Sequence, residues 1–176
     1  PSIAKKVIEG VRPKPRLNLR QREFFPRGGG EPMRLFAGEL LFDYEGQLMH
    51  FNSPKKTATL VRDNEVHEIR RDTKFEKKEA KWLTGLGLKT AAEALPEFET
   101  GELGNEFVGT DGPAPWHQLL SESKDDLETR GWTFRFDGNR KLAAADCEND
   151  YHDVRHLDQT DWFLSLIHIS EPTRPS

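Results

Sequence analysis

The chain has 176 residues, of which 35% are hydrophobic and 32% are charged, and its net charge is −4. This length suffices for one domain with a modest core, and the acidic balance argues against an affinity for nucleic acid spread over the whole chain. The single cysteine, Cys147, excludes an internal disulfide and a cysteine-rich zinc site, and no apolar run approaches the ~20 residues of a membrane helix. We therefore expect a cytoplasmic protein with no membrane partner.

The N-terminal segment is basic. Residues 1–15 contain Pro13 and Pro15 and are predicted to form a linker. Glu9 is the only acid in the first 22 residues, and the cations there are candidate contacts to the phosphate backbone of duplex DNA: Lys5, Lys6, Arg12, Lys14, Arg16, Arg20 and Arg22. A solvated linker between domains is the competing interpretation.

Alternation of polar and apolar residues predicts strands in the first half of the chain. Residues 16–20 form one such pattern, and residues 33–43 form a second that turns at residues 44–47 into a third at residues 48–51. Residues 58–61 and 66–69 flank Asp63 and Asn64, which are good turn residues. The pattern indicates two antiparallel hairpins.

A first helix is predicted to begin at Thr73, where Thr73 and Glu76 have the spacing of a capping box. The helical spacing of Phe75, Trp82 and Leu83 places them on one face, and Gly85 is expected to end the helix.

A second helix is predicted from Pro115 to Arg130, ending at Gly131, after an acidic, glycine-rich loop at residues 94–114. Its apolar stripe consists of Trp116, Leu119, Leu120 and Leu127. A strand follows in which Trp132, Phe134 and Phe136 alternate with polar residues, and we interpret these aromatic residues as core rather than as a base-stacking platform. Further strands are expected at residues 142–157 and from Asp161 onward. The predicted fold class is α+β, with mostly antiparallel β-hairpins and two main helices.

Two motifs that could carry chemistry are rejected. Residues 84–90 resemble a phosphate-binding loop, but Leu88 separates Gly87 from Lys89 and the segment follows a helix instead of a strand. His152 and His156, with Cys147 and several aspartates nearby, could ligate a metal, but hairpins rich in acids and histidine are common at surfaces. We predict no catalytic residue, no bound metal and no cofactor in this chain.

Three stretches resemble a known family. They are residues 34–51 with Glu-Leu-Leu-Phe-Asp-Tyr-Glu-Gly, residues 61–88 with an Arg-Arg-Asp strand end that leads into a helix, and residues 127–163 with Arg-Gly-Trp and a final Asp-Trp-Phe. In this order and spacing they resemble the region that precedes the ATPase motor of bacterial Swi/Snf-type helicases. The similarity covers about Arg16 to Phe163, so we divide the chain into the linker 1–15, a helicase-associated accessory region 16–163 and a tail 164–176. The chain departs from the family in the turn after the Gly-Trp strand, at residues 137–141, and in the loop 94–114.

The resemblance implies a parent protein that hydrolyses ATP, with Mg²⁺, to translocate on duplex DNA. Its catalytic residues would follow Phe163, so none is assigned to this chain, and the motor domain of the parent is the expected partner. The tail 164–176 resembles the translation of a transposon-type sequencing adapter and is expected to be an artefact. A stand-alone β-rich binding module is the alternative, and a metal-dependent hydrolase using His152 and His156 is a third.

Overall fold

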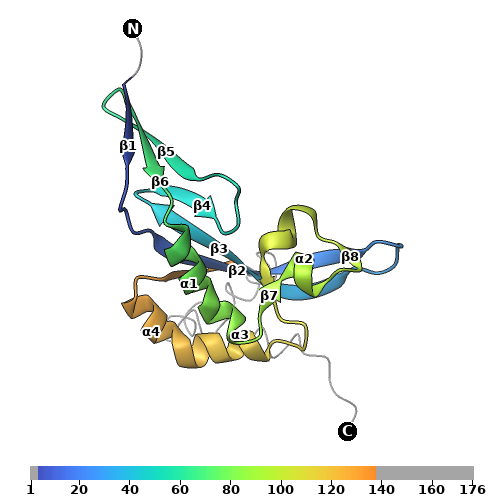
Figure 1. Ribbon diagram of the computed structural model, residues 1–176. Coiled ribbons are helices and arrows are strands. Elements are labelled where there is room, and N and C mark those ends of the chain that lie inside the picture. The colour runs from blue at the N-terminus through green and yellow to red at the C-terminus, as the bar shows by residue number, and fades with distance from the viewer. Residues whose placement is uncertain (1–3, 138–176) are drawn as a thin grey trace, which may run out of the picture.

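The computed structural model describes residues 4–137 and confirms the predicted α+β class (Figure 1). A smaller sheet has the strand order β1-β6-β5, with β1 at Lys5–Ile8, β5 at Thr57–Arg62 and β6 at Glu65–Arg70. A larger sheet runs β10-β2-β3-β9-β7, with β4 paired to β3 and β8 paired to β2. Its strands are β2 (Lys14–Pro26), β3 (Met33–Tyr44), β4 (Gln47–His50), β7 (Lys89–Thr90), β8 (Phe98–Glu99), β9 (Phe107–Val108) and β10 (Thr133–Asp137).

The long hairpin of β2 and β3 is the centre of the larger sheet. The predicted alternation is confirmed, since Leu17 and Leu19 are fully buried while Asn18 and Arg20 lie on the opposite face. Gly38 of β3 lies opposite Leu19, and a Cβ built at Gly38 would be 2.5 Å from the ring of Trp116. The helices can therefore approach this sheet only because residue 38 has no side chain.

The second predicted hairpin is also confirmed. Strands β5 and β6 pair antiparallel, and Asp63 and Asn64 take the left-handed φ values of 50° and 62° that a tight hairpin turn needs. Strand β1 then adds to β6 in a parallel register, with Ile8 beside Ile69. The expectation of a linker over residues 1–15 is therefore wrong at Lys5–Ile8, because these residues occupy a sheet edge that the hairpin leaves free.

Helix α1 (Thr73–Thr84) begins and ends near the predicted residues, but its cap and its buried face differ. The predicted capping box is wrong, because Asp72 is the N-cap residue and its carboxylate accepts a hydrogen bond from the Phe75 N–H at 3.1 Å. Trp82 is 38% exposed, whereas Glu76, Glu79, Ala80 and Leu83 are buried. Two glutamates therefore occupy the helix face where apolar residues were expected.

Residues 94–114 are predicted to be a long loop, but residues 91–113 contain short elements. These are α2 (Ala91–Ala94), β8, a 3-10 helix η1 (Gly101–Asn105) and β9. A small second core gathers there, made of Phe24, Ala37, Ala91, Leu95 and Val108. The apolar residues that interrupt the acidic run are sufficient to hold this segment against the far end of the long hairpin.

The second predicted helix is confirmed as one helical run, made of α3 (Ala114–Gln118), a π-helical segment η2 (Leu119–Ser123) and α4 (Lys124–Thr129). Its predicted apolar stripe is buried, and Gly131 takes a φ of 101° just after it. Strand β10 follows and pairs with β2 in parallel, so the sheet is not built from antiparallel hairpins alone. Trp132 is buried and stacks on the partly buried Phe134, with ring centroids 6.1 Å apart. The strands expected after residue 141 lie outside the described residues.

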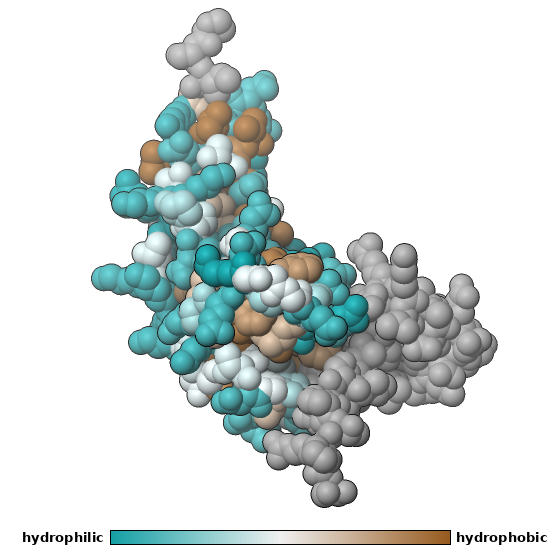
Figure 2. All heavy atoms as spheres, turned by 90° about the vertical axis from the view of Figure 1, so that its right-hand side faces the viewer, coloured by the Kyte–Doolittle hydropathy of each residue, from teal (hydrophilic) through white to brown (hydrophobic). Residues whose placement is uncertain are grey.

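Helices α1, α3 and α4 cover one face of the larger sheet. The main core between them includes Leu17, Leu40 and Phe42 from the strands, Leu83 from α1 and Leu127 from α4. On the opposite face, the part of β2 and β3 near Asn18, Arg20 and Glu39 is polar. Figure 2 shows apolar side chains at the surface near the N-terminal end of the molecule, and the smaller sheet exposes Val7 and Val61 there.

Candidate functional site

Two glutamates of α1 organise the polar interior of the molecule. Glu76 accepts hydrogen bonds from the Tyr44 hydroxyl at 2.6 Å and from Nε of Arg71 at 2.9 Å, and a second Arg71 nitrogen completes a bidentate ion pair. The side chains of Arg71 and Glu76 are only 2% and 4% exposed. A charge pair buried to this extent is stable only when its remaining donors and acceptors are also satisfied.

The Arg71 guanidinium meets that condition. Its remaining hydrogens are donated to the main-chain carbonyls of His50, Ser53 and Lys55, so all five N–H donors of the side chain are used. The Tyr44 hydroxyl in turn accepts a hydrogen bond from the Asp72 N–H at 2.9 Å. Burial, and then the hydrogen bond to Glu76, raise the pKa of Tyr44 well above its ordinary value, so this phenol stays protonated.

Glu79, one turn further along α1, connects this helix to the end of α4 and to the residue that precedes β10. It accepts hydrogen bonds from Arg130 at 3.0 Å and from the Trp132 indole N–H at 3.2 Å. The Arg130 guanidinium also lies 5.4 Å from the ring centroid of Trp82. We call these two clusters, Tyr44–Arg71–Glu76 and Glu79–Arg130–Trp132, the α1 clamps.

The α1 clamps are built for structure rather than for proton transfer. Each carboxylate is already held by an arginine and by a second donor, so neither is positioned to accept a proton from a substrate. Sequence reasoning missed the clamps because it assigned Glu76 to a capping box and Trp82 to the core. The signal available was the spacing itself, since Glu76, Glu79 and Leu83 recur at the helical period of the buried face.

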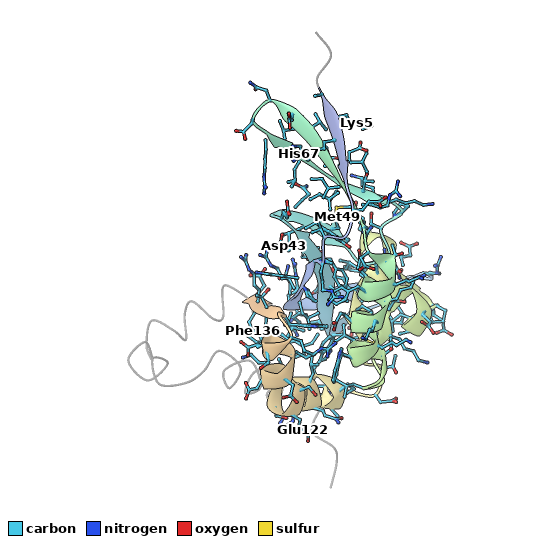
Figure 3. All side chains as sticks on the ribbon, turned by 60° about the vertical axis from the view of Figure 1, so that its left-hand side comes forward. Lys5, Asp43, Met49, His67, Glu122 and Phe136 are labelled. Atoms are coloured by element: carbon cyan, nitrogen blue, oxygen red, sulfur yellow. The ribbon has the colours of Figure 1, made fainter. Side chains whose placement is uncertain are left out.

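The seven predicted phosphate contacts do not form one flexible arm. Three of them are held by acids on neighbouring elements: Lys5 by Glu68, Arg20 by Glu39, and Arg22 by Glu106. The Arg22 pair is bidentate, at 3.1 and 3.0 Å, and its glutamate is buried. Figure 3 shows Lys5 on β1, at the same end of the smaller sheet as His67 of the neighbouring strand β6.

The other four predicted contacts are Lys6, Arg12, Lys14 and Arg16. None of them makes an ion pair with another residue of the described segment 4–137. Lys6, Arg12 and Lys14 are exposed, and Arg16 is partly buried. The Arg12 guanidinium lies 5.1 Å from the ring centroid of Phe75, so this side chain rests against α1.

A cavity of about 420 Å³ is lined by residues of β2, β3 and β4 and by residues around η1. Its wall includes Arg22, Glu39, His50, Glu102 and Glu106. The His50 ring nitrogen lies 3.3 Å from Glu39, which also accepts hydrogen bonds from Asn18 and Arg20. The charges on this wall are therefore largely engaged with one another.

Other predicted features can be placed only in part. Lys89 of the rejected phosphate-loop match lies in β7 after α1 and is exposed. Cys147, His152 and His156 lie outside the described residues, and within residues 4–137 no group of three or more potential ligands could hold a metal ion. Among the same residues, no helix has the length and apolar character to cross a membrane.

Comparisons with protein-family models, with curated protein sequences and with solved structures find no match for this chain.

Proposed function

We propose that this chain is a non-catalytic accessory region that precedes the DNA-translocating motor of a bacterial Swi/Snf-type ATPase. The supporting observation is that the α1 clamps join the three stretches that carry the resemblance. Tyr44 comes from the first stretch, Arg71, Glu76 and Glu79 come from the second, and Arg130 and Trp132 come from the third. Motifs that occur in a fixed order in the sequence are therefore in contact in the fold.

The ion pairs and hydrogen bonds of the α1 clamps are consistent with a structural role for this region. The Arg71–Glu76 pair is buried, and the partly exposed Arg130 pairs with the buried Glu79, so both clamps fix α1 relative to its neighbouring elements. In this proposal ATP and Mg²⁺ bind only to the motor, whose phosphate-binding loop and Asp-Glu box would follow Phe163. The accessory region contacts that motor domain and duplex DNA in the cytoplasm.

The cavity next to Arg22 and Glu106 supports a second candidate function, that of a stand-alone β-rich binding module. A cavity of about 420 Å³ falls within the size range of small-molecule sites, and this one has charged groups on its wall. Such a module would need no motor in the same chain. A ligand that protects the module from thermal unfolding, and whose protection is lost in Glu106→Gln, would support this alternative.

The uncut gene distinguishes the two candidates. Sequencing genomic DNA across the codon of Phe163 should reveal an open frame with a phosphate-binding loop and an Asp-Glu box within roughly a hundred codons. A stop codon shortly after Phe163 would contradict the accessory-region proposal and favour the independent module.

A further inference from the structure

The outer face of α1 is uniformly basic. Lys74, Lys77, Lys78 and Lys81 are all exposed, and their spacing of i, i+3, i+4 and i+7 places them along one side of the helix. The only acids of α1, Glu76 and Glu79, are buried in the α1 clamps. None of the four lysines makes an ion pair with another residue between 4 and 137.

Arg12 extends this surface at the N-terminal end of the helix. Its guanidinium lies over the ring of Phe75, and it makes no ion pair within the described part of the chain. We call Arg12, Lys74, Lys77, Lys78 and Lys81 the α1 basic face.

This arrangement opposes the preferences of an isolated helix. Lys74 and Lys78, and also Lys77 and Lys81, are like charges at i and i+4, which destabilise a helix. Lys74 also lies in the first turn, where the helix dipole disfavours a cation. A surface helix selected for solubility alone would mix both signs of charge. A polyanionic partner would neutralise these lysines and so remove the repulsion between them.

We propose that the α1 basic face binds the phosphate backbone of duplex DNA, a choice of polyanion that rests on the proposed function. The helix rises about 1.5 Å per residue, so Lys74 to Lys81 span roughly 10 Å. With the helix along the duplex axis, that length matches about three phosphate-to-phosphate steps of one strand, since successive phosphates are 3.4 Å apart along that axis. Contacts from lysine to phosphate carry no base information, so the binding is independent of sequence.

A membrane surface fits this helix less well than DNA. Binding in a lipid interface needs an apolar face that can enter the headgroup region. The apolar residues Ala80 and Leu83 of α1 are in the main core, so they are not available for insertion. Trp82 is the one large apolar side chain that α1 exposes, at 38%, and the Arg130 guanidinium lies 5.4 Å from its ring centroid. A single ring beside an arginine is not an apolar strip that could enter a lipid interface, so the α1 basic face suits a rigid row of phosphates better.

Two matched variants of the full chain test this proposal. Lys77→Gln/Lys78→Gln removes two adjacent exposed lysines from α1, and Lys5→Gln/Lys6→Gln removes two adjacent exposed lysines from β1. Binding of a labelled duplex is measured at several salt concentrations from about 50 mM upward. Thermal unfolding of all three proteins is measured in parallel, and equal midpoints show that the exposed substitutions leave the fold intact.

We expect the α1 variant to bind about tenfold more weakly at low salt, and the slope of log affinity against log salt to shrink by about 1.8, since each phosphate contact contributes about 0.9. The β1 variant should stay within about twofold of the original chain. Equal losses in both variants, or a loss confined to the β1 variant, would overturn the proposal. Binding of the chain to anionic phospholipid vesicles but not to the duplex, with the same lysine dependence, would also overturn it.

The two proposals fail in different ways. Lysine-dependent DNA binding without a downstream motor in the gene would refute the accessory-region proposal and leave the α1 basic face intact. A downstream motor together with no binding of this chain to DNA would refute DNA contact through the α1 basic face, but not the position of this region before a motor.

Discussion

At the scale of single residues, Glu76 is the carboxylate that satisfies both Tyr44 and Arg71 in the interior. It receives hydrogen bonds from Tyr44 and Arg71, and Arg71 in turn binds three main-chain carbonyls of the segment between β4 and β5. Loss of the glutamate charge would leave the guanidinium buried without a counter-ion. That consequence is larger than the loss of any one hydrogen bond.

Glu76→Gln should therefore lower the free energy of unfolding by about 3–5 kcal/mol, the range for removing one partner of a buried ion pair. Urea unfolding followed by tryptophan fluorescence measures this change. Glu122→Gln is the control, because Glu122 is exposed and its substitution should change stability by no more than about 0.5 kcal/mol. A loss below about 1 kcal/mol for Glu76→Gln would mean that Arg71 finds other compensation.

The environment of Tyr44 predicts that the free energy of unfolding depends on pH in the alkaline range. Its pKa in the folded state is raised by burial and by the bond to Glu76, whereas an unfolded tyrosine titrates near pH ~10. Because the folded-state pKa is the higher one, the stabilisation is complete below the unfolded pKa and is lost as the pH rises above it.

Tyr44→Phe should consequently lose stability less steeply than the original chain above pH ~10. Unfolding free energies of both proteins between about pH 8 and 11 give the comparison, and the titration of lysines, which both proteins share, cancels in the difference. Parallel curves would show that the Tyr44 phenol ionises as readily in the fold as in the unfolded chain.

At the scale of elements, close contact between the long hairpin and α3 depends on Gly38. The Cβ position at residue 38 is 2.5 Å from the Trp116 ring and 3.0 Å from Leu17, while the Trp116 indole N–H donates to the Phe36 carbonyl at 3.2 Å. The ring is thus held from two sides and cannot move away without losing its hydrogen bond.

Gly38→Ala should destabilise the fold by about 1–3 kcal/mol, as overpacking in a filled core does. Gly28→Ala is the matched control, since nothing lies within 4 Å of its Cβ position and its substitution should stay within about 0.5 kcal/mol. Thermal or urea unfolding distinguishes the two variants. Equal stabilities would show that the helical run can shift to admit the methyl group.

The elements also show what the sequence could predict. Alternation and turn residues predicted the two hairpins, because these signals are local. The apolar period likewise predicted a helix from Pro115 to Arg130, close to the observed helical run from Ala114 to Thr129. The parallel additions of β1 to β6 and of β10 to β2 were missed, since they depend on which edges remain free after the hairpins form. The buried face of α1 was misassigned because Glu76 and Glu79 are satisfied by partners distant in sequence, such as Tyr44 and Trp132.

In the candidate site, too, local sequence features were predictable and contacts between residues distant in sequence were not. The basic residues near the N-terminus were identified by composition, but composition does not reveal that Lys5 and Arg20 face acids on neighbouring strands and that Arg22 faces Glu106 at the end of η1. The α1 basic face was visible only after the acids of the same helix were found to be buried.

At the scale of the whole molecule, the orientation of α1 separates the positive charges of this helix from its negative charges. The chain carries a net charge of −4, and yet the acids of α1 are turned inward and the lysines of α1 outward. The α1 clamps hold this orientation, since rotation of the helix would expose Glu76 and Glu79 and bury lysines instead. The interior polar contacts and the exterior basic face are thus two consequences of one helix orientation.

We propose that this chain supports a motor and contacts DNA but catalyses no reaction itself. ATP turnover by the purified protein, with and without duplex DNA, tests that claim most directly. We expect no turnover above the buffer rate, because the only near match to a phosphate-binding loop has Leu88 between Gly87 and Lys89 and follows α1 rather than a strand. Turnover by the pure chain that disappears in Lys89→Ala would contradict the account.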